Sequence, residues 1–226
     1  SSSKCTPEVI GRATKLRAIC RAGVGIDNVD VPAATKRGII VMNTPGGNTT
    51  STAEHTITLL LSLSRKIPQA CNSVREGKWE RKKFLGTQVS GKVLRVIGLG
   101  RIGKEVAKRA AALEMKVIGY DPFISIGTAS KLNIHQVKNL DELLKQADYV
   151  SLHIPLRNDT KNIISAREFD LMKPGVRIIN CARGGILSED ALVDALESGK
   201  VAGAALDVFE KEPPGDNKLL KFDNVL

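Results

Sequence analysis

The sequence has 226 residues and is poor in several features that would point to particular kinds of protein. Its four cysteines form no Cys-x-x-Cys pair and its three histidines have no metal-ligand spacing, so we expect neither disulfides nor a metal site. Such thiols suit a reducing, cytoplasmic compartment. No apolar run approaches the roughly 20 residues that span a bilayer, so no membrane association is expected.

Aromatic residues are also scarce, while the charge is large and unevenly spread. Only 5 Phe, 2 Tyr and 1 Trp are present, too few for base-stacking platforms. Residues 1–120 hold 21 Lys and Arg against 8 Asp and Glu, within a net charge of +10 for the chain. A basic half can meet nucleic acid or steer anionic small molecules. With so few aromatics, we favour an anionic metabolite and cofactor and expect no nucleic acid partner.

Short β-branched runs alternate with helical patterns from Leu16 onward, which is typical of βαβ units around a parallel sheet. Nearly continuous apolar runs suit strands that are covered on both faces. We therefore predict an α/β fold with a doubly wound parallel sheet. The expected strands are 16–20, 38–42, 93–98, 115–120, 148–154, 176–180 and 201–206, and the expected later helices are 101–113, 141–146, 165–171 and 188–198.

A long helical stretch is expected over residues 49–76. Ser51 and Glu54 have the spacing of a capping box, and Pro68 predicts a kink or break. The segment 78–84 that follows is basic and amphipathic, and it is expected to be a connection rather than a core element.

The strongest motif lies where one expected strand turns into a helix. Gly98 permits a tight turn, Gly100 lets backbone N–H groups approach a pyrophosphate, and Gly103 lets the helix pack close to the strand. Arg101 adds a cation at the same place. Asp121 ends the next strand, where a carboxylate accepts hydrogen bonds from ribose hydroxyls and repels a 2′-phosphate. The motif predicts a dinucleotide site that prefers NAD.

Charged loops follow the later strands, at the sheet edge where ligands bind in such folds. Arg183 stands among glycines after 176–180, and three carboxylates lie in 207–212 after the last strand. An arginine there can bind a carboxylate with two parallel hydrogen bonds. Residues 21–25 add an arginine and two glycines, which form a possible anion nest. Solvated loop charges and a plain glycine turn are the structural alternatives.

Together these residues resemble the D-isomer-specific 2-hydroxyacid dehydrogenases along essentially the whole chain. The resemblance implies a Rossmann-type NAD-binding domain at 45–226 and the remnant of a smaller flavodoxin-like substrate domain at 1–44. Segments 21–25 and 78–84 indicate the branch of the family that acts on 3-phosphoglycerate. The motifs that carry the resemblance are 21–30, 43–45, 77–84, 98–103, Asp121, 181–185 and 207–214.

The resemblance implies NAD-dependent oxidation of 3-phospho-D-glycerate to 3-phosphohydroxypyruvate, the first step of serine biosynthesis. Arg183 and Glu212 are the implied catalytic residues: Arg183 binds the carboxylate and polarises the carbonyl, and Glu212 orients a catalytic histidine and raises its pKa. Asp207 is implied to hold the nicotinamide carboxamide. The full set of expected cofactor-binding residues is Gly98, Gly100, Arg101, Ile102, Gly103, Asp121, Ile154, Cys181, Ala182, Arg183 and Asp207.

The substrate's phosphate and carboxylate are expected at Arg21 and the backbone of Gly23, Val24 and Gly25. Val24 stands where close relatives have a threonine that meets the cofactor, so no role is expected for its side chain.

The acid–base histidine of the family lies in a Pro-His-x-Gly loop, and the sequence ends at Leu226, just short of where that loop is expected. His153 fits a cofactor-side strand end, His55 lies on the long helical stretch, and His135 is expected in a connecting segment. We therefore expect a fragment, truncated at both ends, that binds NAD and turns over phosphoglycerate poorly.

Family members form homodimers or homotetramers through the cofactor domain, which implies an interface at residues 49–84. Trp79 is expected to anchor a neighbouring subunit and Arg81 to reach its phosphate site; the alternative is that Trp79 covers its own domain. Two other functions stay open: a hydroxypyruvate or glyoxylate reductase, and a non-enzymatic NAD-sensing scaffold like the C-terminal-binding-protein corepressors.

Overall fold

The computed structural model describes residues 3–125 and 134–226. The chain divides into two compact units, Ser1–Ser51 and Thr52–Leu226. The border predicted after residue 44 therefore falls within the first unit. None of the helices in the described ranges is long and apolar enough to cross a bilayer.

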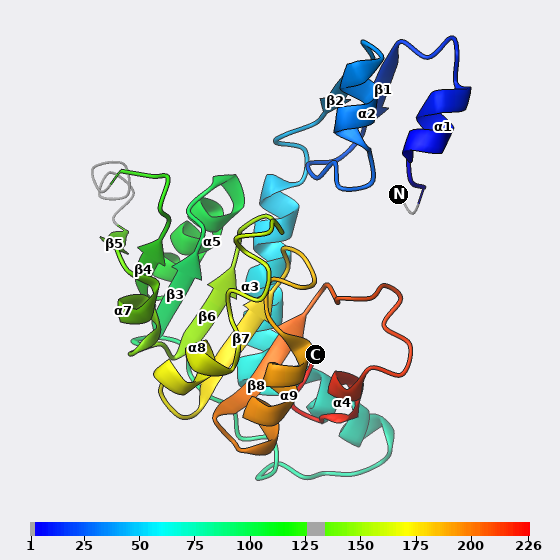
Figure 1. The fold of residues 1–226 in the computed structure, drawn as a ribbon. Coiled ribbons are helices and arrows are strands. Elements are labelled where there is room, and N and C mark those ends of the chain that lie inside the picture. The colour runs from blue at the N-terminus through cyan, green and yellow to red at the C-terminus, as the bar shows by residue number, and fades with distance from the viewer. Residues whose placement is uncertain (1–2, 126–133) are drawn as a thin grey trace. The chain divides into compact units, whose positions relative to one another are not determined.

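The first unit contains a two-stranded parallel sheet and two short helices (Figure 1). Ile10, Ala34 and Ile39 form its small core. Asp30 begins the second helix by accepting a hydrogen bond from the Ala33 N–H at 2.7 Å, which satisfies a free helical donor. The elements are α1 (Pro7–Arg12), β1 (Ala18–Arg21), α2 (Val31–Lys36) and β2 (Ile40–Asn43).

The second unit is built on a six-stranded sheet of order β5-β4-β3-β6-β7-β8. Every pairing is parallel, and the order changes direction at β3, so the doubly wound prediction is confirmed. The strands are β3 (Val93–Ile97), β4 (Lys116–Tyr120), β5 (His135–Val137), β6 (Tyr149–Leu152), β7 (Val176–Asn180) and β8 (Val201–Leu206).

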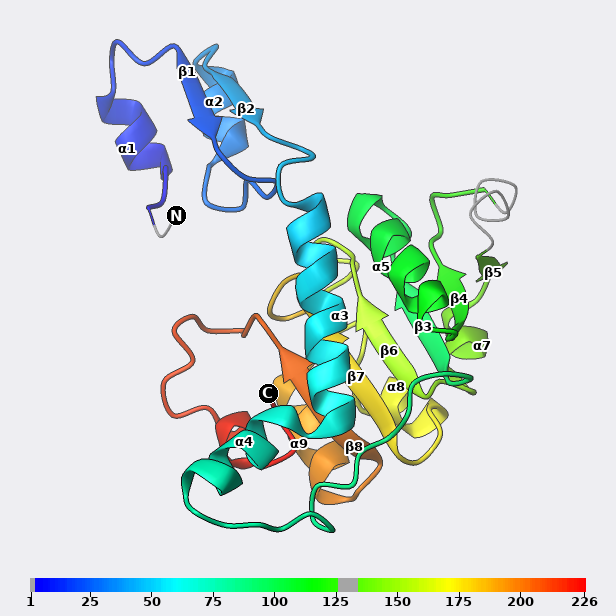
Figure 2. The ribbon, with the colours of Figure 1, turned by 180° about the vertical axis from the view of Figure 1, so that it is seen from behind.

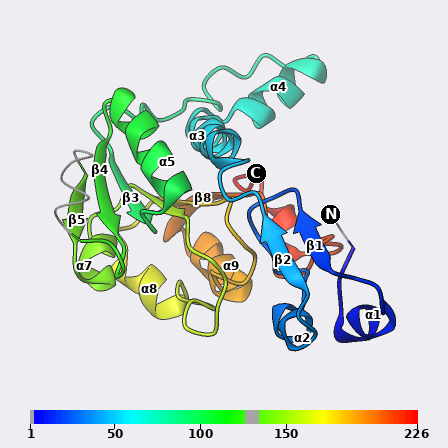
Figure 3. The ribbon, with the colours of Figure 1, turned by 90° about the horizontal axis from the view of Figure 1, so that it is seen from above.

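Helices cover both faces of this sheet, which is why its strands are apolar on both sides (Figures 2 and 3). On one face Leu94 and Val96 of β3 join a core cluster with α3 (Thr49–Arg65) and α5 (Arg101–Ala112). On the other face Ile97 joins the cluster of α7 (Leu140–Leu144), α8 (Ala166–Leu171) and α9 (Glu189–Glu197). A 3-10 helix, η1 (Lys218–Lys221), follows β8 along the chain.

The long helical stretch is broken, as Pro68 predicted. Helix α3 ends at Arg65, Lys66 is left-handed with φ of 52°, and α4 (Ile67–Arg75) begins with Pro68 in its first turn. The predicted capping box is wrong, because α3 begins earlier, at Thr49. Ser51 lies inside the helix, where its hydroxyl donates to the Asn48 carbonyl at 3.1 Å.

Two further expectations need correction. His135 lies in the edge strand β5, paired opposite Ile118 of β4, and not in a connection. The strands of the first unit begin two residues later than expected, at Ala18 and Ile40. Helix α1 was not expected, because its six residues are too few to show an apolar period.

Arg95 places a charge in the middle of β3, with only 5% of its surface exposed. Its Nε–H has no hydrogen-bond partner among the residues that the structure describes, and burial lowers the pKa of the guanidinium. The carboxylates of Glu142 and Asp148 offset this only in part. A buried cation without an ion-pair partner costs stability.

Replacing Arg95 with leucine is therefore expected to leave the free energy of unfolding unchanged or raise it by about 1 kcal/mol. Urea titration of both proteins measures the difference. Arg177→Leu is the matched control: its guanidinium donates to the Thr87 hydroxyl at 3.0 Å and lies 5.6 Å from the centre of the Tyr149 ring, so its loss should destabilise. A clear loss of stability in Arg95→Leu would contradict this account.

Candidate active site

The turn from β3 into α5 is shaped by three glycines with different tasks. Gly98 has φ of +92°, and a Cβ there would lie 2.5 Å from the His153 carbonyl oxygen. A Cβ on Gly103 would lie 1.9 Å from the Gly98 carbonyl oxygen. A Cβ on Gly100 would meet no protein atom within 4 Å. Gly98 and Gly103 therefore close the turn, and Gly100 keeps its outer side open for a ligand.

Helix α5 begins at Arg101 with Gly100 as its N-cap, and Gly100 has no side chain to cap the first N–H groups of the helix. These donors and the positive end of the helix dipole suit the pyrophosphate of a dinucleotide. Arg101 is exposed, whereas the half-buried Ile102 side chain packs on the core. The backbone of Ile102, and not its side chain, is left to meet a cofactor.

Asp121 is held against the glycine turn. Its Oδ2 accepts a hydrogen bond from the Leu99 N–H at 2.9 Å, and its Oδ1 accepts one from the Phe123 N–H at 2.8 Å. Each carboxylate oxygen keeps a lone pair for a further donor. The structure thus brings Asp121 beside the glycine turn, and its role toward a ribose stays a prediction.

His153 follows β6 and is an uncharged residue of this edge. Its N–H donates to the Ile97 carbonyl at 2.8 Å, and its Nε2 lies 2.8 Å from the Ser151 hydroxyl. Burial lowers the pKa of His153 to about 4, so the imidazole is neutral at neutral pH. Ile154 lies against Gly98, where its Cγ2 would be 2.8 Å from an added Cβ.

The loop after β7 is held by a buried asparagine that the sequence analysis missed. Asn180 accepts a hydrogen bond from the Ala182 N–H at 3.0 Å and donates to the Arg183 carbonyl at 2.9 Å. Arg183 is half-buried, and its Nη1 donates to the Ala182 carbonyl at 2.6 Å. Burial raises the pKa of the Cys181 thiol to about 11, so it stays protonated. A polar residue at the end of an apolar strand was the available signal for Asn180.

The loop after β8 lies beside the loop after β7. The Asp207 N–H donates to the Asn180 carbonyl at 3.0 Å. A Cβ on Gly184 would lie 1.9 Å from the Phe209 carbonyl oxygen, so the two loops touch backbone to backbone. Glu212 is exposed and accepts a hydrogen bond from the Phe209 N–H at 3.3 Å. The structure therefore brings Arg183 and Asp207 to neighbouring strand ends.

The expected substrate residues lie in the first unit, where Arg21 ends β1. The Gly23 N–H donates to the Arg21 carbonyl at 3.0 Å, and the Asn43 side-chain amide donates to the Val24 carbonyl at 2.7 Å. These bonds fix the loop that runs on through Gly25, with the half-buried side chain of Arg21 at its start. Their role in binding substrate stays a prediction.

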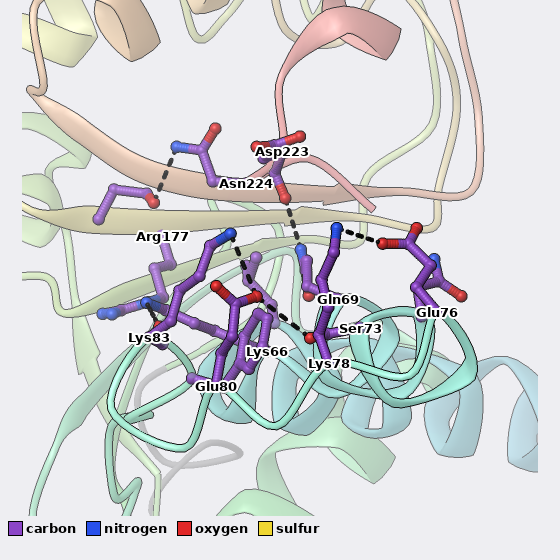
Figure 4. A pocket seen from close by; sticks show the side chains of 14 residues that line it. Lys66, Gln69, Ser73, Glu76, Lys78, Glu80, Lys83, Arg177, Asp223 and Asn224 are labelled. Atoms are coloured by element: carbon purple, nitrogen blue, oxygen red, sulfur yellow. Dashed lines mark hydrogen bonds and ion pairs between the residues drawn. The ribbon is translucent and has the colours of Figure 1, made fainter.

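A cavity of about 390 Å³ lies elsewhere in the second unit, between α4, the segment 78–84 and the first residues of β7 and β8 (Figure 4). Two of its lysines form ion pairs with carboxylates. Nζ of Lys78 lies 2.8 Å from Oε2 of Glu76, and Nζ of Lys83 lies 3.7 Å from Oε2 of Glu80. This balance does not suit a strongly anionic ligand, and no motif in the sequence predicted the cavity.

Comparison with known proteins decides the family. Residues 57–226 match the model of the NAD binding domain of the D-isomer specific 2-hydroxyacid dehydrogenases. The chain belongs to this family. The resemblance noted in the motifs is thereby confirmed, and so is the expectation of an NAD-binding Rossmann domain.

The relatives found share high identity over this whole chain but are much longer. The chain is 56% identical to D-3-phosphoglycerate dehydrogenase of Archaeoglobus fulgidus and 50% identical to that of Homo sapiens, and it covers 43% and 42% of their lengths. Among solved structures, D-lactate dehydrogenase from Aquifex aeolicus, complexed with NAD and lactic acid, is 34% identical with a TM-score of 0.88. That match covers 99% of this chain and 72% of the lactate dehydrogenase.

A glyoxylate reductase from Paecilomyes thermophila is 39% identical to the chain, with a TM-score of 0.89. The match covers 97% of this chain and 67% of the reductase. The fold is thus shared by family members whose names give different substrates.

Substitution at Gly100 and Gly103 separates cofactor binding from folding. Gly100→Ala is expected to leave the melting temperature nearly unchanged, because its Cβ meets no protein atom within 4 Å, and to weaken NAD binding about tenfold. Gly103→Ala is expected to destabilise the fold through the 1.9 Å approach to Gly98. Calorimetric titration and thermal melts measure the two effects. Unchanged NAD affinity in Gly100→Ala would place the pyrophosphate elsewhere.

Proposed function

We propose that this chain supplies the cofactor site of an enzyme that oxidises 3-phospho-D-glycerate to 3-phosphohydroxypyruvate with NAD, the first step of serine biosynthesis. The relatives of that name, 56% and 51% identical over the whole chain, support this substrate. The observation that carries the cofactor assignment is the open glycine turn at the head of α5 with Asp121 beside it. The enzyme is proposed to work in the cytoplasm.

Asp121 supports NAD over NADP as the cofactor. A carboxylate held by the Leu99 N–H beside the turn can accept hydrogen bonds from the two ribose hydroxyls, and its negative charge repels a 2′-phosphate. The glycine turn fits the pyrophosphate, because nothing fills the space beyond Gly100.

When bound, NAD would supply the acceptor for the hydride that leaves C2 of the substrate. Arg183 is proposed to bind the substrate carboxylate and the C2 oxygen, and its positive charge stabilises the oxygen as the C2 hydroxyl loses its proton. Asp207 is proposed to hold the nicotinamide carboxamide, which orients the ring toward C2. Both residues stand at adjacent strand ends, on loops that touch.

A base must take the proton of the C2 hydroxyl. Glu212 is proposed to orient a histidine for this task and to raise its pKa. His153 does not suit the role, because desolvation lowers the pKa of its imidazole to about 4 and its Nε2 lies 2.8 Å from the Ser151 hydroxyl. Arg21 and the backbone of residues 23–25 are proposed to bind the phosphate and carboxylate of the substrate.

A hydroxypyruvate or glyoxylate reductase is the second candidate. The likeness to the glyoxylate reductase from Paecilomyes thermophila favours it, since the fold and much of the sequence are shared. Its substrate has no phosphate and would gain little from Arg21. A non-enzymatic NAD-sensing scaffold is the third candidate. NAD binding without dehydrogenase activity in the complete protein would favour it.

A dimer or tetramer formed through the second unit is also proposed. Four large apolar residues are exposed along α4 and the segment that follows it: Ile67, Val74, Trp79 and Leu85, with exposed fractions of 48%, 56%, 77% and 74%. Apolar side chains gathered on one segment mark an interaction surface. Trp79, the most exposed of them, is the proposed anchor, and Arg81 is proposed to reach the phosphate site of the neighbouring subunit.

Steady-state assays of the full-length protein test the reaction. Arg183→Lys is expected to lower kcat/KM for 3-phosphoglycerate at least about a hundredfold while the Kd for NAD stays within a few fold, because lysine cannot form the paired hydrogen bonds. Arg157→Lys, on an exposed loop, serves as the control.

Arg21→Leu is expected to raise the KM for 3-phosphoglycerate and to leave the KM for glycerate unchanged. Faster turnover of glycerate than of 3-phosphoglycerate by the wild type would overturn the substrate assignment.

Sedimentation velocity tests the assembly. Trp79→Ala is expected to shift the protein toward monomer by raising the dissociation constant about tenfold or more, since truncation of a buried anchor residue costs roughly 2 kcal/mol. Phe123→Ala is the control, because Phe123 is 81% exposed but lies outside this segment. An unchanged sedimentation coefficient for Trp79→Ala excludes the anchor role.

A further inference from the structure

Helix α3 reaches the cofactor edge of the sheet with two consecutive side chains. His55 Nε2 lies 3.3 Å from Oδ1 of Asp207, at the end of β8. The next residue, Thr56, is fully buried, and Cys181 at the end of β7 belongs to the same core cluster as Leu60 of this helix. The helix therefore contacts the ends of two neighbouring strands at once.

The contact between His55 and Asp207 has little value for folding. The two side chains are 47% and 49% exposed, and ion pairs at such exposure contribute little to stability. The adjacent residue is different, because Thr56 is fully buried and its hydroxyl donates to the Thr52 carbonyl at 2.8 Å within the helix. Thr56 thus belongs to the buried face of the helix, whereas the exposed His55 reaches one oxygen of the Asp207 carboxylate.

We infer that His55 is a positioning residue for the nicotinamide end of the cofactor. It holds Oδ1 of Asp207 by hydrogen bond or ion pair, so that Oδ2 stays turned toward the amide N–H of the carboxamide. This inference rests on the proposed role of Asp207 in the proposed function. A carboxylate fixed before binding loses less conformational freedom when the cofactor arrives, and its affinity for the carboxamide is higher for that reason.

The inference is tested by comparing two ligands that share an adenosine half. NAD carries the carboxamide and ADP-ribose does not, while both contain the pyrophosphate and the adenosine ribose. His55→Leu is expected to weaken NAD binding about three- to tenfold in calorimetric titrations and to leave ADP-ribose binding unchanged, since one side chain is no longer held in place. His55→Gln, which can place an amide donor near the position of Nε2, is expected to restore most of the affinity for NAD.

A double-mutant cycle ties the effect to Asp207. In an Asp207→Ala background, His55→Leu is expected to cause no further loss of NAD affinity, because the group that it positions has been removed. Thermal melts of each variant show that the fold is retained, as the exposure of both side chains leads us to expect.

Three results would overturn the inference: unchanged NAD affinity in His55→Leu, an equal loss for NAD and ADP-ribose, or the same loss with and without Asp207. Failure of the wild type to bind either ligand overturns the proposed cofactor site itself. If the wild type binds both ligands equally well and Asp207→Ala has an unchanged affinity for NAD, the role of Asp207 is overturned, and with it that of His55.

Discussion

The approach of Gly103 to the carbonyl oxygen of Gly98 is the constraint on which the cofactor edge depends. With no side chain at Gly103, the first turn of α5 can lie directly against the end of β3. That contact directs the unsatisfied N–H groups of α5 to the outer side of the turn, where Gly100 leaves space. Asp121 reaches the same turn through the Leu99 N–H, so the acidic group and the amide groups are held together.

The electrostatics of this edge are simpler than its residue types suggest. His153 and Cys181 are both titratable in principle, yet burial keeps the imidazole neutral and the thiol protonated. Charged side chains of both signs stand beside them at this edge, among them Arg183, Asp207 and Asp121. In the proposed function the cation Arg183 binds the substrate, and the anions Asp207 and Asp121 bind the cofactor.

The sequence predicted the second unit well, because its strands are apolar on both faces and its helices follow the glycine and proline signals. The break near Pro68 and the strand positions from Val93 onward were predictable for that reason. Short elements were not: α1 and β5 contain too few residues for a period to show. The Ser51 capping box failed because an earlier start of α3 competes for the same residues.

Within the candidate site, residues on a single motif were predictable and contacts between distant segments were not. The glycine turn and Asp121 are one βαβ unit, so their spacing identifies them. The hydrogen bonds of Asn180 and the contact between His55 and Asp207 depend on where α3, β7 and β8 meet in space. No local pattern in the sequence predicts such contacts between segments that are distant along the chain.

The backbones of Gly184 and Phe209 are in contact, so the loops after β7 and β8 are packed directly against each other. Arg183 stands on one of these loops and Asp207 begins the other, so neither can shift without displacing its neighbour. Evolution can therefore lengthen or shorten these two loops only in step.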